Sequence, residues 1–517
     1  MLFTRLSCHG LLGLASLATA STDFARGTDK FVNTTANAAR ACSELAHKFP
    51  TKLYLPGAAD FDEESTAIWS KTCVLTPSCV FEPTNAHDLS KAIRIISDAR
   101  SHFAVRAGGH MPVRGSNSVQ PGVLIALSSL NQRILSPNRA IASIGPGQTW
   151  GDVYGWLAQH GLAVNGGRYS PVGVGGLLLA GGIGFWGSTR GWSADSVVGY
   201  EVVLPDGRIV EVKNHGADKD LFWALKGGHN HFGIVTRYDM TTFSAGPAFI
   251  RTVVWNLTDS PATDASFFSA LSNYTAPGGG IEDTNVAVMP ILAYAPGINH
   301  HEVIMGQIAF GTDPDPVPFR EFNAIQGPVV LDNEGGQVYP SWTYLPFAAG
   351  ELFGARDFRQ AFHTTSFKPD PRIIRFINRT VIEFADRALP ATANVAFTYQ
   401  PISKQWLQAS RAAGGDALDL DPRDGPFIAG LLSTQWVGEV DDTLMTEFAR
   451  NVTAAIERET KNLGVYLPFK YLGDAGAGQD PFASYGGGKS KAKLRKIQEH
   501  YDHKGFFKTY LGHGFPL

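Results

Sequence analysis

Apolar residues recur at helical spacing in the first part of the chain. Between residues 84 and 101 they form one continuous stripe, and Thr84 or Asn85 can cap the helix that this stripe predicts. Short β-rich runs at 79–81 and 103–106 flank the stripe. The pattern therefore predicts a β-α-β unit.

Further strands are predicted where short apolar runs are bounded by turn residues. Residues 197–212 are expected to form a hairpin that turns at Pro205-Asp206-Gly207. The other strands are expected at 122–127, 140–144, 251–255, 285–289, 303–310, 394–399 and 431–436. Beyond about residue 250 the strands alternate with helical runs, which indicates a second structural region.

Three more helices follow from apolar periodicity and composition. One is expected over 149–160, ending at Gly161, and a basic helix is expected around 489–500. The clearest helix covers 441–461. Its apolar side is expected to hold Leu444, Phe448, Ala449, Val452 and Ile456.

Length and charge narrow the class of protein. A chain of 517 residues is long enough for two domains, and 18% charged against 44% hydrophobic residues excludes a disordered or collagen-like chain. The formal charge of −3 gives no polyanion-binding field, so nucleic acid is not expected as a partner. The longest weakly polar stretch, 171–187, is too short and too rich in glycine to span a membrane.

The N-terminus has the pattern of a secretory signal. Arg5 precedes the apolar stretch 11–17, and Ala18-Thr19-Ala20 resembles a cleavage site, so residues 1–20 are expected to be removed. A buried N-terminal helix is the alternative. A secreted glycoprotein is predicted, with five glycosylation sequons at Asn33, Asn256, Asn273, Asn378 and Asn451. Cys42, Cys73 and Cys79 remain after cleavage, which allows one disulfide and one free thiol, the pairing being open. No metal site is expected.

Glycine, with 56 residues, is concentrated around 165–191. There Gly182-Ile-Gly184-Phe-Trp-Gly187 matches the dinucleotide-binding pattern, and Asp206 lies near the expected ribose-binding distance. A genuine fingerprint opens a long helix, whereas residues 188–195 contain Gly191 and no helical stripe. We therefore do not expect a Rossmann domain.

Two glycine-rich loops, 107–117 and 165–191, are better candidates for a phosphate cradle. Glycines allow consecutive backbone N–H groups to converge on an anion without a helix behind them, although such glycines can also simply turn tight β-corners. His110 lies inside the first loop. An imidazole nitrogen is nucleophilic enough to attach to an electrophilic cofactor carbon.

These residues resemble a known family. Arg106-Ala-Gly-Gly-His110 after a Phe-Ala-Val strand is similar to the histidine-bearing loop of FAD-linked oxidases of the vanillyl-alcohol-oxidase fold, most closely the fungal berberine-bridge-enzyme-like branch. Three later stretches agree in order, and the likeness spans roughly residues 40–517. They are Gly173-Val-Gly-Gly176 through Gly184 to Asp195, the stretch 220–236, and Gln479-Asp-Pro481 with Ser484-Tyr485-Gly486.

The resemblance implies an α+β fold with a PCMH-type FAD-binding domain of two α/β subdomains. This domain would cover 75–245 after an N-terminal segment at 21–74. An α/β substrate domain at 246–464 would place a sheet over the flavin, and 465–517 would return to the FAD domain.

The resemblance also implies the cofactor site. FAD would be bound covalently through the 8α position to His110. The other implied FAD-binding residues are Arg106, Gly108, Gly109, Gly115, Ser116, Asn117, Val172, Gly173, Gly175, Gly176, Gly182, Gly184, Asp195 and Ile234. His229 could assist the flavin's phosphate or ring.

Two positions depart from the family pattern. Tyr169 stands where many relatives carry a second covalent cysteine, so a single histidyl link is predicted. Asp474 ends a Tyr471-Leu-Gly-Asp run where relatives often have Tyr-x-Asn. Tyr399, Tyr471 and Asp474 are the candidates for the catalytic base.

The implied reaction uses FAD and O2 to oxidise an alcohol or C–H centre of a small hydrophobic natural product, with oxidative cyclisation as a further possibility. A carbohydrate oxidase is the alternative within the fold, and the missing cysteine argues against it. A secreted flavin-binding protein without turnover and a cyclisation chaperone are the alternatives from other classes.

Overall fold

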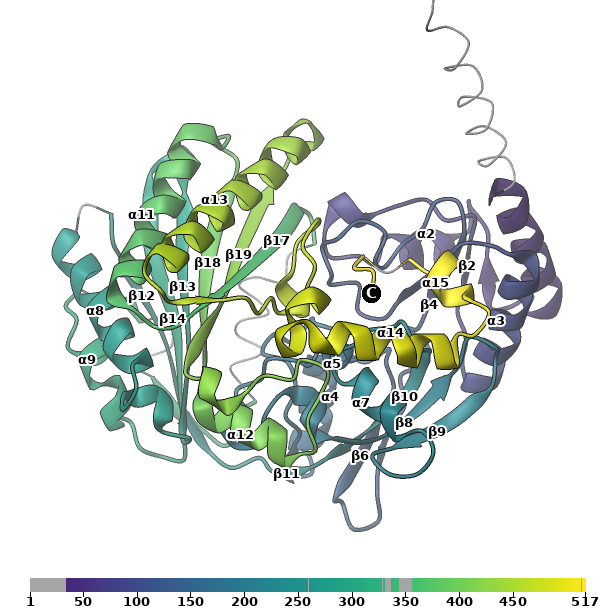
Figure 1. Ribbon diagram of the computed structural model, residues 1–517, viewed down its shortest axis with the longest axis horizontal. Helices are drawn as coiled ribbons and strands as arrows, with labels where there is room; N and C mark the ends of the chain where they lie inside the picture. Colours follow the sequence, from purple (N-terminus) through teal and green to yellow (C-terminus); the bar gives the residue numbers. More distant parts are fainter. Residues whose placement is uncertain (1–33, 259, 328, 331–335, 344–355, 513) are drawn as a thin grey trace, which may run out of the picture.

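The computed structural model describes residues 34–517 apart from 259, 328, 331–335, 344–355 and 513. Two blocks lie side by side in Figure 1, one built on two small sheets and the other on a nine-stranded sheet. The expected α+β fold class is confirmed. The signal segment 1–20 and Asn33 lie outside the described residues.

The first small sheet contains the predicted β-α-β unit. Strands β2 (Cys79–Phe81) and β3 (Phe103–Arg106) both run parallel to β4 (Val123–Ala126), which lies between them. Helix α3 (Ala86–Ala99) connects β2 and β3, and the Asn85 side chain caps it by accepting from the Asp88 N–H. The apolar stripe of α3 is buried, so the prediction from periodicity is confirmed.

The second small sheet has the order β5-β6-β10-β8-β9. Its β8 (Val197–Val203) and β9 (Ile209–Lys213) form the predicted hairpin, and Gly207 supplies a positive φ of 80° in the turn. Asp206 lies in this turn. The expectation against a Rossmann domain holds in the described structure, because Gly187 opens only the four-residue helix α6 (Gly187–Arg190).

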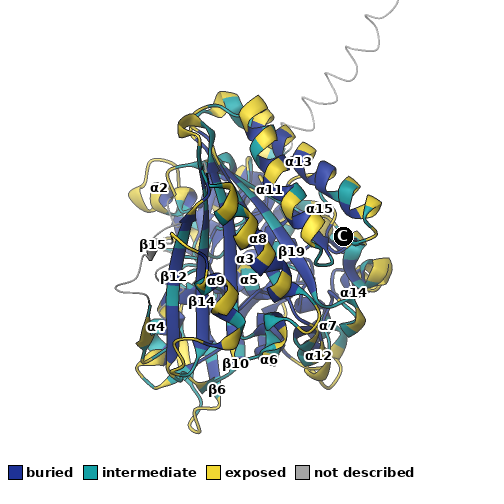
Figure 2. Cartoon of the chain, turned by 90° about the vertical axis from the view of Figure 1, so that its left-hand side faces the viewer, coloured by how far each residue is buried: buried dark blue, intermediate teal, exposed yellow. Residues whose placement is uncertain are grey.

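The nine-stranded sheet is covered by helices on one face. Helices α8 (Pro261–Thr275), α11 (Pro371–Ala388) and α13 (Asp442–Asn462) pack on it through buried side chains, and Figure 2 shows their yellow outer faces above dark strands. Since alternate residues of a strand point to opposite faces, the other face is available to the first block.

Helix α13 differs from its prediction at one position. Phe448, Ala449, Val452 and Ile456 are buried as expected, but Leu444 is exposed and Met445 takes its place in the core. Met445 precedes three of these buried residues by three, four and seven positions, so its side chain lies on the same face of the helix.

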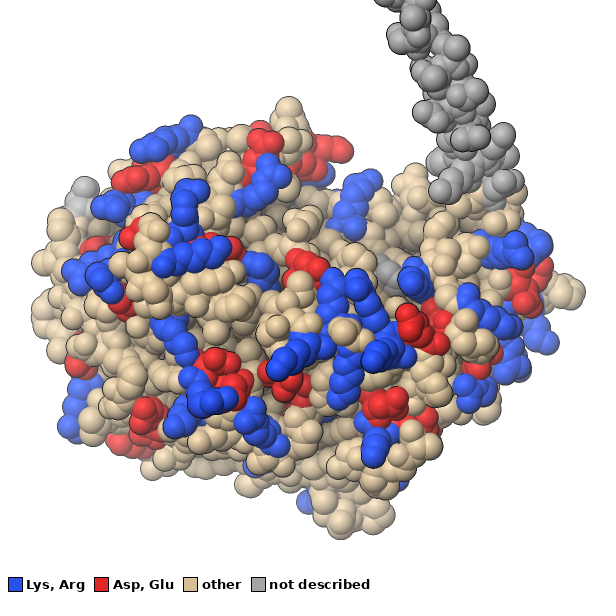
Figure 3. Space-filling view, in the orientation of Figure 1, with Lys and Arg blue, Asp and Glu red and all other residues tan. Residues whose placement is uncertain are grey.

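The C-terminal segment lies against the first block. Helix α14 (Lys489–Tyr501) is the expected basic helix, and Figure 3 shows basic side chains gathered over it. Lys493 lies 3.4 Å from the centre of the Trp223 ring. Further on, Leu511 forms a bridge with Phe103, and the Phe515 carbonyl lies 3.0 Å from His231 Nε2. The domain boundaries themselves stay predictions.

The sequence patterns located most strands but gave several of them too short, and missed other elements. The remaining bounds are β1 (Leu53–Tyr54), α2 (Ala59–Thr66), β5 (Arg133–Leu135), β6 (Ile141–Ile144), α4 (Trp150–Ala158), β7 (Leu162–Ala163), α5 (Val174–Leu179), α7 (Lys219–Leu225), β10 (Ile234–Thr241), β11 (Phe243–Ser244), β12 (Ala248–Asn256), β13 (Val286–Ala295), β14 (His300–Phe310), α9 (Arg320–Asn323), β15 (Val329–Val330), β16 (Gln337–Tyr339), β17 (Arg359–Phe367), β18 (Asn394–Ile402), α12 (Lys404–Ala412), β19 (Phe427–Trp436), β20 (Tyr466–Leu467) and α15 (Phe506–Tyr510). A helix also runs through 34–48.

The structure resolves the cysteine alternatives. Cys42 and Cys79 form a disulfide with a Cα–Cα distance of 5.9 Å, while Cys73 is a buried free thiol. One sequon lies in the interior: Asn378 is buried and donates to Asp264 at 2.7 Å. No helix in the described part of the chain is long and apolar enough to cross a membrane.

Candidate FAD and substrate site

A cavity of about 590 Å³ lies between the first block and the open face of the nine-stranded sheet. Its walls come from the loop around His110, from the segment 168–183 and from strands β13, β14, β17, β18 and β19. The chain segment 471–474 contributes a further wall. Both predicted glycine loops therefore meet at one cavity, opposite the expected covering sheet.

The two glycine loops touch through their backbones. A Cβ added to Gly108 would lie 2.5 Å from the Gly173 Cα, and one added to Gly173 would lie 2.6 Å from the Gly108 Cα. Such distances do not occur between real Cβ atoms and backbone, so both positions require glycine. The contact fixes the loop that carries His110 against the loop that begins α5.

The second loop differs from its prediction. We expected a cradle without a helix behind it, but Val174–Leu179 forms the short helix α5 directly after Gly173. The apolar residues 177–179 thus belong to this helix, and α5 presents Gly175 and Gly176 to the cavity.

His110 lies at the cavity wall with its ring stacked on Trp69. The two ring centres are 4.2 Å apart and the planes differ by 11°. Burial, with a smaller contribution from Arg356, lowers the pKa of His110 to about 4. The imidazole is therefore neutral near pH 7, which leaves a nitrogen lone pair for bond formation.

Most of the implied FAD-binding residues line the cavity. These are Gly108, Gly109, His110, Ser116, Asn117, Val172, Gly173, Gly175, Gly176 and Ile234, and His229 joins them. His229 has a positive φ of 62°, and burial lowers the pKa of its ring.

Five implied residues are not among those that line the cavity. Arg106 forms a buried ion pair with Glu64, and Asp195 forms one with Lys226 at 2.7 Å. Gly115, Gly182 and Gly184 are also absent from the cavity lining; a Cβ on Gly184 would meet Asn165 Oδ1 at 2.4 Å. Contact of these five with the cofactor stays a prediction, and the side chains of Arg106 and Asp195 are engaged in their ion pairs.

The cavity has features that fit a bound flavin nucleotide. A Cβ on Gly176 would meet no protein atom within 4 Å, so the backbone there faces open space. Asn117 Oδ1 is buried and has no partner among the described residues, although Asn117 Nδ2 donates to the Met111 carbonyl at 3.0 Å. A buried acceptor without a donor is costly unless a ligand supplies one. His110, Asn117, Gly176 and Ile234 would hold the cofactor.

Asp474 is the base candidate with the best position. Its carboxylate lines the cavity, is buried, and accepts a 2.6 Å hydrogen bond from Gln400 Nε2. Gln400 Oε1 in turn accepts from Arg168 Nη2. Burial raises the pKa of Asp474 to about 6, against the lowering effects of Gln400 and Arg168. The carboxylate is therefore a stronger base than an exposed aspartate, yet ionised at pH 7.

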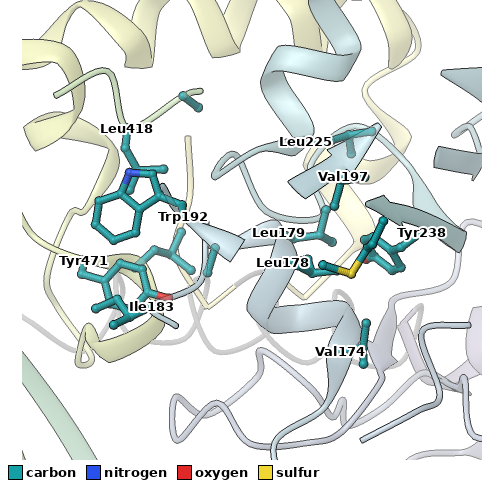
Figure 4. Packing of buried hydrophobic residues seen from close by; sticks show 14 of the residues in the cluster. Val174, Leu178, Leu179, Ile183, Trp192, Val197, Leu225, Tyr238, Leu418 and Tyr471 are labelled. Carbon is teal, nitrogen blue, oxygen red and sulfur yellow. The ribbon is translucent and has the colours of Figure 1, made fainter. Parts of the chain in front are cut away.

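Tyr471 also lines the cavity, but its hydroxyl is engaged. It accepts from the Gly182 N–H at 3.1 Å, and the ring stacks on Trp192 with a centre distance of 5.8 Å. Figure 4 shows Tyr471 and Trp192 close together, with Ile183 nearby. Burial raises the pKa of Tyr471 far above its usual value, which disfavours a phenolate. We assign it to the support of the glycine segment.

The third base candidate is corrected. Tyr399 points to the opposite face of the sheet, where it packs against Phe268 and Phe397, and its hydroxyl donates to the Ile374 carbonyl at 3.5 Å. It does not line the cavity. Its neighbour Gln400, one residue further along β18, does.

Sequence reasoning missed the sheet face that lines the cavity. Strand pairing aligns cavity-facing residues in rows, one of which joins Ala396, Ala293 and Glu302. The period-two pattern was visible, but the facing direction was not. Arg168, Gln400, His300, Glu302 and Trp69 were not singled out, and no local motif marks them. Among the described residues no cluster suited to a metal ion is found.

Known proteins are similar to this chain in sequence. The sequence profile of an FAD binding domain matches residues 77–213. "FAD-dependent monooxygenase prx3" of Penicillium roqueforti is 34% identical over 93% of this chain and 94% of its own length. "FAD-dependent monooxygenase AOL_s00215g279" of Arthrobotrys oligospora is 30% identical over 99% of both chains.

Solved structures share the fold at low sequence identity. Xylooligosaccharide oxidase from Myceliophthora thermophila, in complex with xylobiose, superposes with a TM-score of 0.73 at 18% identity, covering 92% of this chain and 99% of that one. Berberine bridge enzyme in complex with (S)-reticuline gives 0.69 at 16% identity, with 90% and 97% covered. The chain therefore belongs to the FAD-dependent oxidoreductases that share the fold of berberine bridge enzyme.

Proposed function

We propose that this oxidoreductase is a secreted oxidase that removes a hydride and a proton from an alcohol or C–H centre of a small hydrophobic natural product, in fungal secondary metabolism. The observation that carries the proposal is the placement of a buried carboxylate, Asp474, on the same cavity as His110 and the glycine loops. Ile291, Ile304 and Leu431 give the covering sheet an apolar centre. Small apolar molecules suit such a surface.

His110, Asn117, Gly176 and Ile234 would hold FAD, which when bound would supply two-electron redox chemistry: acceptance of a hydride equivalent from the substrate and reoxidation by O2 with release of peroxide. The chain's own residues orient the substrate and take its proton. Asp474 accepts the hydroxyl proton as the carbonyl forms, while Gln400 holds the carboxylate in place through its 2.6 Å hydrogen bond. Arg168 fixes the Gln400 amide so that its Nε2 faces Asp474.

We further propose a single covalent link between FAD and His110. The neutral imidazole supports it, and Tyr169 on the cavity wall leaves no cysteine for a second link. In a His110→Ala variant, all flavin should move from the acid-precipitated pellet to the supernatant, because the imidazole that would form the bond is gone. Visible spectra of both fractions measure this.

The control for that experiment is His215→Ala, which removes an exposed histidine beside Asn214. Its flavin should stay in the pellet. Flavin in the supernatant of the unaltered protein would contradict the covalent link but not FAD binding. A well-folded protein without any flavin would contradict the proposed function as a whole.

A monooxygenase is the second candidate, because the two fungal relatives above are named as such. The two reactions differ in the fate of O2. An oxidase releases both oxygen atoms as peroxide, whereas a monooxygenase transfers one to the product. Turnover under ¹⁸O2 with mass spectrometry of the product separates them, and unlabelled product with one peroxide per turnover supports the oxidase.

A carbohydrate oxidase would instead release peroxide with oligosaccharides. Tyr169, at the position of the second covalent cysteine, places a bulky ring on the cavity wall and disfavours a wide sugar cleft. A non-catalytic flavin protein would show no reoxidation by O2 after chemical reduction, and a cyclisation chaperone would turn over with its flavin already reduced.

Secretion is supported by the Cys42–Cys79 disulfide, since such bonds persist in oxidising compartments. Asn256, Asn273 and Asn451 are exposed and open to N-glycans. Glycopeptide mass spectrometry of the protein from culture medium tests both properties.

A further inference from the structure

The end of the cavity away from Asp474 carries a second polar pair. His300 and Glu302 stand two residues apart on β14, so they share the face that lines the cavity. His300 Nε2 lies 2.7 Å from Glu302 Oε2. Since a carboxylate only accepts, the histidine nitrogen carries the hydrogen and donates.

The strand register shows how far this pair lies from the base. Glu302 aligns with Ala293 and Ala396, and Ala396 precedes Gln400 by four residues on β18. Four residues of a strand span roughly 13 Å. The wall between the two polar ends carries no charge; Ile291 and Ala293 face the cavity there, together with the hydroxyl residues Thr398 and Ser433.

Glu302 retains accepting capacity after it has bonded His300. A carboxylate offers about four lone-pair sites. In the described part of the chain, no other side chain donates to Glu302. The side chains of His300 and Glu302 are 38% and 25% exposed, so a molecule in the cavity can reach both.

The polar residues beside the pair on the described cavity wall are uncharged. Among the described residues that line the cavity, Glu302 and Asp474 are the carboxylates, and Arg168, the one arginine, is bonded to Gln400. Asn394 and Gln435 face each other in the next row and add neutral amides to this end. A protic group of a ligand is thus the natural partner of Glu302.

From this arrangement we propose that His300 and Glu302 form a second substrate subsite, in which the Glu302 carboxylate accepts a hydrogen bond from a hydroxyl or amine group at the end of the substrate opposite its oxidised carbon. His300 is a positioning residue that holds the carboxylate. The inference rests on the proposed function for the identity of the reacting end. It narrows the substrate class to elongated apolar molecules with a protic group at the remote end.

The test uses the holoenzyme and three rigid probes of similar shape: 4-phenylphenol, 4-phenylbenzylamine and 4-methoxybiphenyl. The first donates as a hydroxyl, the second as a cation, and the third cannot donate. Binding is followed through tryptophan fluorescence, because Trp69 lines the cavity. Flavin content is determined first from the visible spectrum.

Glu302→Gln should weaken binding of a protic probe about tenfold or more, the effect of a lost hydrogen bond to a charge, and leave 4-methoxybiphenyl within about twofold. His300→Gln should weaken the same probe to a smaller extent. If affinity is lost only for 4-phenylphenol, the group that Glu302 binds is a hydroxyl. If it is lost only for 4-phenylbenzylamine, that group is a cation. Glu447→Gln, on the exposed face of α13, is the matched control and should change nothing.

Equal loss for all three probes, or no loss for either protic probe in both variants, overturns the subsite. A protein without flavin contradicts the proposed function instead, and the fluorescence titrations still decide on the subsite.

Discussion

Replacing Asp474 by Asn should slow reduction of the flavin by substrate by about 10²–10⁴-fold, the usual contribution of a positioned general base. The amide preserves the size of the side chain but cannot take the substrate's proton. Because Gln400 Nε2 donates to the carboxylate, the side-chain oxygen of the introduced amide can still accept that bond, which keeps the local structure. Anaerobic stopped-flow absorbance measures the rate.

The pH dependence of the same step gives an independent check. Burial raises the pKa of Asp474 to about 6, so the ionised, active base is present above that pH and lost as the pH falls through it. The rate should therefore decline below about pH 6 in the unaltered enzyme, and this limb should be absent in Asp474→Asn. Asp480→Asn, an exposed aspartate bonded to Lys491, is the control and should keep both rate and limb. A limb that persists in Asp474→Asn assigns the base to another group.

The choice among the three base candidates illustrates what sequence patterns leave open. The alternation along 394–400 predicted β18, but not which set of alternate residues faces the cavity. Residues 397 and 399 pack under the helices, while 394, 396, 398 and 400 line the cavity. A shift of one residue moves a side chain to the other face, so Tyr399 and Gln400 exchange roles once the direction is known.

Sequence patterns predicted correctly those features that depend on residues close together in the chain. The helix cap, predicted at Thr84 or Asn85 and found at Asn85, the stripe of α3 and the turn at Gly207 depend on neighbours a few residues away. The loop around His110 was located through its glycines. Its contact with Gly173, 65 positions along the chain from Gly108, depends on the tertiary fold, as does the bond between Gln400 and Asp474.

Asp195 is another residue whose tertiary contacts the sequence did not reveal. It was expected at the cofactor, but its carboxylate meets Lys226 Nζ at 2.7 Å in a site where both side chains are fully or almost fully buried. Lys226 also donates to the Gly415 carbonyl at 2.9 Å, next to a second buried carboxylate, Asp416. This buried cluster connects the first block to the segment between α12 and β19. Asp416 in turn accepts the Leu418 N–H at 2.8 Å.

The cluster also supports the glycine segment of the site. The Leu418 side chain packs against two glycines. A Cβ added to Gly181 would lie 3.2 Å from Leu418 Cδ1, and one added to Gly227 would lie 2.3 Å from it. Gly181 precedes the Gly182 N–H that bonds Tyr471. Anchoring of Asp416 therefore keeps Leu418, and with it this segment, in position.

Replacing Lys226, the cation of this cluster, should lower the free energy of unfolding by a large amount. Lys226→Met leaves Asp195 and Asp416 buried without their counter-charge, and breaking such a pair typically costs about 3–5 kcal/mol. The double variant Lys226→Met/Asp195→Asn should recover a large share, because one of the stranded charges is gone. Urea unfolding followed by tryptophan fluorescence measures both.

The stability lost in Lys226→Met should increase as the pH rises. Burial raises the pKa of Asp195 and of Asp416, and Lys226 opposes this. Without Lys226 both carboxyls bind protons more tightly in the folded state than in the unfolded chain, so the variant loses stability as pH rises above about 4. Its deficit against the unaltered protein should be smaller near about pH 5 than near about pH 8, since a protonated carboxyl needs no counter-charge. A deficit that is the same at both values would assign the loss to the removed packing of the lysine stem, and the double variant would then recover nothing.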